Sequence, residues 1–322
     1  MGGSVRTPVH LRRESRILTL MVLNTETSIT VTDTDALQSR ALAAATGRKE
    51  PTLRIRPTRG WVALNLRELW NYRDLLWILV ERNIKVIYKQ TAIGIGWVAL
   101  QPLIGAGVLS VIFGRIAKLP SDGAPYPLFV FCGLTAWNYF SQTAQRSSTS
   151  LINNSQLVSK VYFPRMLIPL SHTFSTLVDF TVMLFMIFAL MAMYSFAPSW
   201  RLLAIPGFLI LTAMAATGVA LWFSALSVKY RDTSYALPFF LQIWMYASAV
   251  VYPTSMIASQ QLRSLFALNP VVGFVEGFRW CVIGRSALTP TMLWITIGTS
   301  FFALLSGAFF FRRVERVFAD II

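Results

Sequence analysis

The segment TMLWITIGTSFFALLSGAFFF, residues 291–311, is a run of twenty-one residues without a charged side chain. A helix needs about 20 apolar residues to cross the hydrocarbon core of a bilayer, so this run fits a transmembrane helix. Because backbone groups cannot stay unpaired in lipid, the sequence predicts an all-α, polytopic membrane protein. Six spans are predicted, at 93–116, 126–144, 166–196, 202–228, 235–251 and 291–311.

The composition agrees with a membrane protein. The 322 residues are 55% hydrophobic and only 13% charged, which lies outside the range of soluble domains. A net charge of +15 is compatible with nucleic-acid binding, but the basic residues gather at the ends of the apolar runs, as membrane topology requires. We therefore expect no nucleic-acid partner. Cys132 and Cys281 lack CxxC spacing and nearby histidines, so neither a metal site nor a disulfide framework is expected.

The orientation follows from the basic residues that flank the spans. Twelve lie on one side and six on the other, so both termini are expected in the cytoplasm. Residues 1–60 lack sustained apolar periodicity and are expected to form a disordered cytoplasmic extension. Residues 91–322 would then form the six-helix transmembrane domain.

Residues 61–90 are predicted to form an amphipathic helix in the membrane interface. From residue 66 onward, apolar side chains recur at helical spacing and charged side chains follow the opposite side. Aromatic rings beside the apolar side, with bases opposite, suit a helix that meets lipid headgroups. The alternative is a helix packed on a soluble domain, for which the sequence offers no candidate.

The segment 259–290, between the fifth and sixth spans, is apolar but is interrupted by proline and glycine. Irregular backbone is tolerated at membrane depth where protein or a wet cavity surrounds it. We expect a re-entrant pair of short helices on the outer side, with a surface loop as the alternative. Glu276 and Arg279, three residues apart, are expected to pair as helix neighbours.

The third span contains two ionisable residues, His172 and Asp179, on one helix face about two turns apart. Ionisable groups inside a membrane are costly and often functional. A proton relay is one interpretation. Hydrogen bonding to neighbouring helices is the interpretation that we favour.

Five motifs, in order, resemble the permease subunit of ABC-type polysaccharide exporters, the Wzm-like class that moves O-antigen, capsule or teichoic acid chains. The resemblance covers about residues 66–322 and departs from the family pattern at Ala249, where many relatives have proline. The motifs are YKQT-x-x-G-x-x-W (88–97) followed by Pro102, KVYFPRMLIPLS (160–171), KYRDTSY (229–235), NPVVGFVEGFR (269–279) and FRRVERVFADII (311–322).

The resemblance implies a transport subunit rather than an enzyme, located in the cell inner membrane. Two copies of the chain would work with two ABC ATPase subunits to export a lipid-linked polysaccharide. The sequence contains no Walker A motif, G-x-x-x-x-G-K-[ST], so ATP and Mg²⁺ are expected on the partner ATPase and no cofactor on this chain.

The resemblance also implies where this chain meets the ATPase. The cytoplasmic loop 146–165 is long enough for a short helix that would dock on that subunit, although a solvated loop is the simpler alternative. The residues assigned to this coupling loop are Asn153, Asn154, Gln156, Leu157 and Lys160.

Three further sets of residues are assigned to the path of the substrate. Arg82, Lys85 and Lys89 would meet anionic phospholipid and the substrate's pyrophosphate at the entry point. Pro270, Glu276 and Arg279 are assigned to an outer gate. Aromatic rings can pack on the C–H faces of sugars, although lipid packing and interfacial belts are the alternative. The aromatic residues expected to line a channel are Trp137, Tyr139, Phe240, Trp244, Tyr246 and Tyr252.

Two other functions stay open. An ABC permease for a drug or a lipid would share the six spans without needing an aromatic path. A membrane-embedded glycosyltransferase or polymerase would need catalytic groups that converge on a cavity, and the spans supply only Asp179 and His172.

Overall fold

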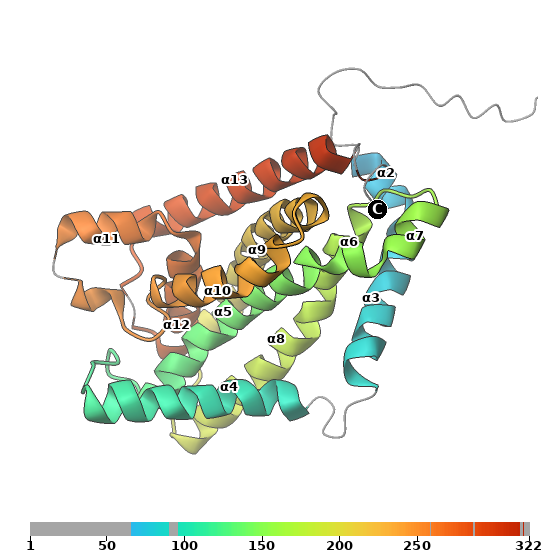
Figure 1. The fold of residues 1–322 in the computed structure, drawn as a ribbon. Helices are drawn as coiled ribbons and strands as arrows, with labels where there is room; N and C mark the ends of the chain where they lie inside the picture. Colours follow the sequence, from blue (N-terminus) through green and yellow to red (C-terminus); the bar gives the residue numbers. More distant parts are fainter. Residues whose placement is uncertain (1–65, 90–95, 258, 286, 316–317, 319–322) are drawn as a thin grey trace, which may run out of the picture. The chain divides into compact units, whose positions relative to one another are not determined.

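The computed structural model describes residues 66–89, 96–257, 259–285, 287–315 and 318, and throughout these ranges the regular structure is helical (Figure 1). The predicted all-α fold is therefore confirmed. The α-helices are α2 (Leu66–Asn71), α3 (Arg73–Tyr88), α4 (Gly96–Leu109), α5 (Tyr126–Ser148), α6 (Ser150–Asn153), α7 (Ser155–Lys160), α8 (Leu167–Met193), α9 (Ile205–Lys229), α10 (Thr233–Tyr246), α11 (Gln260–Ala267), α12 (Pro270–Ile283) and α13 (Pro290–Glu315). A π-helix, η1 (Ser110–Ile116), continues α4, and the 3-10 helices are η2 (Trp200–Ala204) and η3 (Thr254–Met256).

Four of these helical segments are long and apolar enough to cross a membrane. They correspond to the first, third, fourth and sixth predicted spans, at Gly96–Ile116, Leu167–Met193, Trp200–Lys229 and Pro290–Glu315. The other two predicted spans coincide with α5 and α10. α5 is more polar than these four segments, and α10 has only 14 residues. The count of six spans thus stays a prediction.

The fifth predicted span ends earlier than the sequence indicated. The apolar run continues to residue 251, but α10 ends at Tyr246 and Ala249 has a positive φ of 54°. The predicted end was wrong because the carbonyls of Ala249 and Val250 accept hydrogen bonds from the Arg279 guanidinium instead of from a helical turn.

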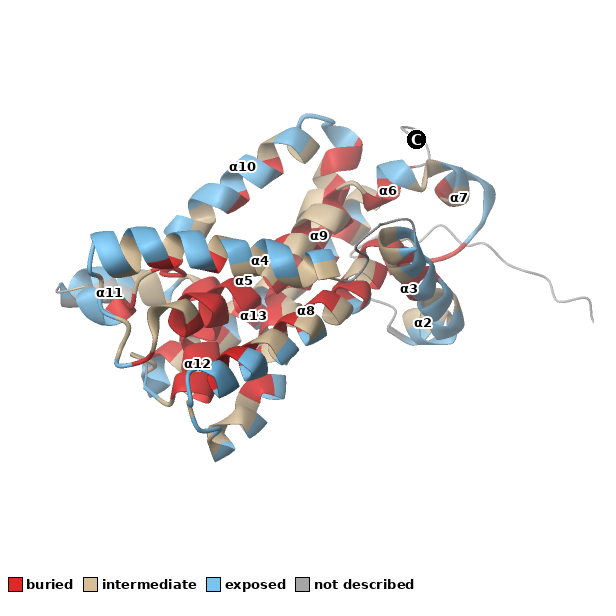
Figure 2. Ribbon diagram, turned by 90° about the horizontal axis from the view of Figure 1, so that it is seen from below, coloured by how far each residue is buried: buried red, intermediate tan, exposed pale blue. Residues whose placement is uncertain are grey.

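α5 lies at the centre of the bundle, where α8, α9 and α12 pack around it. Most of its residues are buried, whereas α4 and α10 expose much of their surface (Figure 2). α9 and α13 pack so closely that a Cβ added to Gly218 would lie 2.3 Å from the backbone of Ala303. Small residues at such contacts are how membrane helices bring their backbones together.

The predicted amphipathic helix appears as α2 and α3, which meet at Tyr72. Leu79 and Val80 of α3 are buried, and the Asn83 amide donates to the Ser171 hydroxyl of α8 at 2.8 Å. α3 therefore packs on α8 along one side. Its location in the membrane interface stays a prediction, and the predicted extension 1–60, residues 61–65 and residue 90 lie outside the described residues.

A pair of helices, α11 and α12, lies between α10 and α13, as the sequence predicted. The Asn269 side chain caps α12 by accepting from the Val271 amide, and Gly284 ends it with a φ of 78°. Nearly every residue of α12 is buried, so the surface-loop alternative is wrong for this helix. Whether the pair is re-entrant stays a prediction.

Candidate functional site

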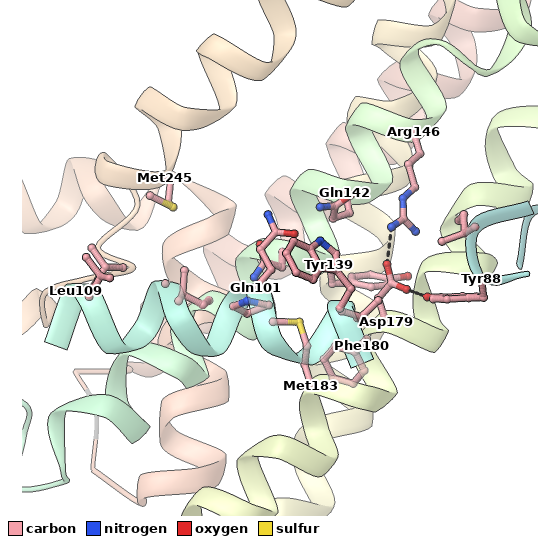
Figure 3. Close-up of a pocket in the computed structure, with 18 of the residues that line it drawn as sticks. Tyr88, Gln101, Leu109, Tyr139, Gln142, Arg146, Asp179, Phe180, Met183 and Met245 are labelled. Atoms are coloured by element: carbon pink, nitrogen blue, oxygen red, sulfur yellow. Dashed lines mark hydrogen bonds and ion pairs between the residues drawn. The ribbon is translucent and has the colours of Figure 1, made fainter. Parts of the chain in front are cut away.

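A pocket of about 580 Å³ lies between α4, α5 and α8, with the ends of α3 and α10 at its border (Figure 3). Its wall combines apolar side chains with amide, phenol and charged groups. Such a mixture, mostly apolar with a few polar groups, is typical of sites for organic ligands.

α5 presents its polar side to this pocket. Asn138, Gln142 and Arg146 are four residues apart, so they follow one face of the helix, and all three line the pocket. They are partly exposed on a helix whose other sides are mostly buried. Gln101 of α4 lines the pocket as well, and Figure 3 shows Gln101 and Gln142 on neighbouring helices. The α5 side of the pocket is thus a row of hydrogen-bonding groups.

One end of the row is closed by a cluster of three side chains from three helices. The Arg146 Nη2 lies 2.7 Å from Asp179 Oδ2 of α8, and the hydroxyl of Tyr88, from α3, donates to Asp179 Oδ1 (Figure 3). Burial raises the pKa of the Tyr88 hydroxyl, and the adjacent carboxylate raises it further, so this group stays protonated as a donor. We call these three residues the Asp179 cluster.

The cluster bears on one of the two interpretations of Asp179. Pairing with neighbouring helices is confirmed, because the carboxylate contacts both α3 and α5. His172 does not follow the same pattern. Its buried Nδ1 has no hydrogen-bond partner within the described residues.

A fully buried arginine lies against the other half of α5. Arg279 is fully buried, forms the predicted ion pair with Glu276 at 3.1 Å, and lies 3.8 Å above the Phe129 ring. It also donates to the carbonyl of Ala249, and Glu276 accepts from the Thr254 hydroxyl. These contacts tie α12 to the irregular segment after α10.

Two of the three predicted gate residues, Glu276 and Arg279, therefore contact the irregular segment after α10. Pro270 stands at the first turn of α12, where its missing amide hydrogen has no cost. Gly133 of α5 faces the same segment, and a Cβ there would lie 2.7 Å from the Val250 carbonyl oxygen. The gating role of Pro270, Glu276 and Arg279 stays a prediction.

The structure brings only part of the predicted aromatic set to the pocket. Tyr139 and Tyr246 line it, and the Tyr139 hydroxyl donates to the Thr173 carbonyl. Trp137 instead lies in the core, with its ring centre 5.7 Å from that of Phe140.

The other three aromatic residues lie outside the pocket wall. Phe240 is exposed on α10. The Trp244 indole donates to the Asn269 side chain at 3.1 Å, and the Tyr252 hydroxyl donates to the Tyr246 carbonyl at 3.0 Å. Their assignment to a channel stays a prediction.

The predicted coupling loop contains two short helices, α6 and α7. Asn153, Gln156 and Lys160 are exposed, and Leu157 packs partly against an apolar cluster. Asn154 accepts a 2.7 Å hydrogen bond from Arg82 of α3. Two predicted sites that the sequence treated separately are therefore in direct contact.

The basic residues of α3 and its C-cap residue, Lys89, border a shallow hollow of about 410 Å³. Arg82, Lys85 and Lys89 all line it together with Glu81, whose carboxylate lies 2.5 Å from the Lys85 ammonium. The hollow carries a net positive charge.

The pocket wall includes five residues that were not predicted from the sequence: Gln101, Asn138, Gln142, Arg146 and Tyr88. A signal was present for three of them, because Asn138, Gln142 and Arg146 repeat every four residues in the region of the second predicted span. No local pattern places Gln101 or Tyr88 beside them.

Comparison with known proteins identifies the family. The sequence model described as "ABC-2 type transporter" matches residues 74–283, which include every residue that lines the pocket. The chain belongs to the ABC-2 type transporter family. It is therefore a permease, the multi-pass membrane subunit of an ABC transporter.

Curated relatives of this permease share one name, "O-antigen export system permease protein RfbA". A relative from Myxococcus xanthus is 29% identical over 217 residues, covering 66% of this chain and 82% of the relative. Two relatives from Klebsiella pneumoniae are 27% and 26% identical over 250 residues, covering 77% of this chain and 95% of each relative.

Proposed function

We propose that this permease exports a lipid-linked polysaccharide across the cell inner membrane, with energy from ATP. The alignment with O-antigen export permeases carries the proposal, because it extends over 95% of the length of two relatives. The pocket supports it, since a polyhydroxylated substrate needs hydrogen-bonding groups inside a membrane protein.

The energy source of the permease would be a separate ABC ATPase subunit that binds ATP and Mg²⁺. The sequence of the permease has no Walker A motif with which to bind nucleotide itself. The working unit would contain two permease chains and two ATPase subunits, with both permease termini in the cytoplasm.

The exposed side chains of α6 and α7 would dock on that ATPase. Asn153, Gln156 and Lys160 provide polar contacts, while Asn154 and Leu157 hold the short helices against the bundle. α6 directly follows α5, and the Arg82–Asn154 hydrogen bond joins the same region to α3. A movement of α6 and α7 would thus reach both α3 and α5, which meet again at the Asp179 cluster.

The substrate would enter at the basic side of α3. Arg82, Lys85 and Lys89 give this helix a positive hollow that suits phospholipid headgroups and the pyrophosphate of a lipid carrier. At the other end of the path, Glu276 and Arg279 would control the irregular segment after α10, where Ala249 and Val250 accept from Arg279.

A gene deletion tests the proposal. In the organism that encodes the permease, deletion should remove the surface polysaccharide and leave lipid-linked polymer on the cytoplasmic side, as detected by glycan staining of whole and permeabilised cells. Re-expression of the chain should restore the surface signal.

The alternatives give other results. Unchanged surface polysaccharide with altered tolerance to a drug or altered lipid composition would indicate a drug or lipid exporter. Sugar incorporation by the purified chain alone would indicate a glycosyltransferase or polymerase. Either outcome would contradict polysaccharide export.

A further inference from the structure

We propose that the pocket between α4, α5 and α8 is a subsite for uncharged sugar units, recognised by the side-chain amides of Gln101, Asn138 and Gln142. The inference rests on the proposed function, because it names which part of a lipid-linked polysaccharide would occupy this pocket. Pyrophosphate recognition would belong to a different surface, the basic hollow of α3.

The three amides are available for a ligand. None of them has a hydrogen-bond partner within the described residues, although other polar side chains of the neighbouring helices are engaged. Each amide offers two donors and one acceptor oxygen. An acyl chain in this pocket would leave these groups unpaired, which costs about 1–3 kcal/mol for each group.

The charge of the pocket favours a neutral occupant. Arg146 and Asp179 are the charged side chains among the described residues of its wall, and they neutralise each other at 2.7 Å. A diphosphate carries two or more negative charges, whereas the cation of this wall, Arg146, is already paired with Asp179. The hollow of α3, with Arg82, Lys85 and Lys89 against Glu81, is the better place for those charges.

The size and the apolar part of the wall fit a short run of sugar rings. The volume of about 580 Å³ falls within the range of about 300–1,000 Å³ that is common for ligand sites. Trp97 and Tyr246 line the pocket and are both exposed, so each offers an aromatic ring to the C–H face of a sugar. Amides would then contact hydroxyls while rings contact the apolar faces.

Protection of single cysteines from thiol labelling tests the subsite in the full-length permease. Val108→Cys places a thiol in the pocket wall and keeps the three amides, and Leu100→Cys places one on the same helix at an exposed residue outside the pocket wall. The native Cys132 and Cys281 are fully buried, so their background labelling should be low. A small methanethiosulfonate reagent would be applied to membranes in which the ATPase partner is inactivated, so that substrate stays on the permease.

Three membrane preparations distinguish binding of the sugars from binding of the lipid carrier. In membranes with the complete lipid-linked polysaccharide, labelling of Val108→Cys should fall at least about threefold relative to membranes without it, while labelling of Leu100→Cys stays unchanged. Membranes with only the pyrophosphate-linked lipid carrier, lacking sugar, should give no protection. Protection by the carrier alone would overturn the sugar assignment, and equal labelling in all three membranes would overturn the subsite.

An export measurement provides an independent readout. Asn138→Leu and Gln142→Met keep the side-chain size but remove the amides. Each should lower the amount of surface polysaccharide about fivefold, which is the effect expected from the loss of one hydrogen bond. Gln145→Met is the matched control and should export normally at equal membrane abundance. Normal export by both pocket variants would contradict the inference, whereas normal surface polysaccharide after gene deletion would contradict the proposed function itself.

Discussion

Two arginines, one partly buried in α5 and one fully buried in α12, pair with carboxylates of the bundle. Arg146 pairs with Asp179 on the pocket side, and Arg279 lies over the Phe129 ring and pairs with Glu276. A buried ion pair contributes little net stability, but the loss of one partner leaves an uncompensated charge. The two arginines therefore act mainly to specify how the helices meet.

Asp179→Asn should destabilise the permease by about 3 kcal/mol, because it leaves Arg146 largely buried without its counter-charge and weakens the contact with Tyr88. The midpoint of thermal unfolding in detergent, followed by size-exclusion chromatography, measures this effect. Thr181→Val changes an exposed residue of the same helix and is the control. The Arg146→Met, Asp179→Leu double variant should recover part of the loss. An Asp179→Asn midpoint equal to that of the control would show that the cluster is not needed for helix packing.

The sequence separation of the two partners determines which of these contacts could be predicted from the sequence. Glu276 and Arg279 are three residues apart, so the helix rule for neighbouring charges was sufficient. Asp179 is 91 residues from Tyr88, and Asn154 is 72 residues from Arg82. No local pattern predicts such pairs, because they depend on which helices become neighbours.

The helices themselves were largely predictable from hydrophobicity and length. α8 and α13 nearly match their predicted spans, because their apolar runs are continuous. α10 does not match, because its C-terminal end is set by Arg279, a residue from another helix. Helix boundaries that depend on distant side chains are thus the part that the sequence alone missed.

Gly218→Ala should lower stability by about 1–3 kcal/mol, because the added Cβ would lie 2.3 Å from the Ala303 backbone and would push α9 away from α13. Gly298→Ala is the matched control, since no atom lies within 4 Å of its added Cβ. Alanine at that position should be neutral or slightly stabilising, by up to about 1 kcal/mol. Thermal unfolding of the two variants in the same detergent gives the comparison. Equal midpoints would mean that the two backbones are not in contact in the membrane.

At the scale of the whole described bundle, α6 and α7 connect an exposed surface to the pocket. The segment contacts α3 through Arg82 and continues directly from α5, and both helices contribute to the Asp179 cluster. A movement that begins at α6 and α7 can therefore reach the pocket through α3 and α5.

Lys160→Glu should weaken association with the ATPase subunit about tenfold or more, because it reverses an exposed charge on the proposed docking surface. Its thermal midpoint should stay unchanged, since Lys160 has no role in the core. Co-purification from membranes and ATPase stimulation measure the effect, with Ser159→Ala in the same helix as control. Normal association of Lys160→Glu would place the docking surface elsewhere.

The length of α10 has a consequence for the lipid around it. Fourteen residues rise about 21 Å, whereas the hydrocarbon core of a bilayer is about 30 Å thick. As the predicted fifth span, α10 would leave the remaining height either to a thinner bilayer or to the irregular backbone that Arg279 contacts. A bilayer around α10 would thus be either thinner than about 30 Å or bordered, beyond Tyr246, by backbone carbonyls that an arginine satisfies.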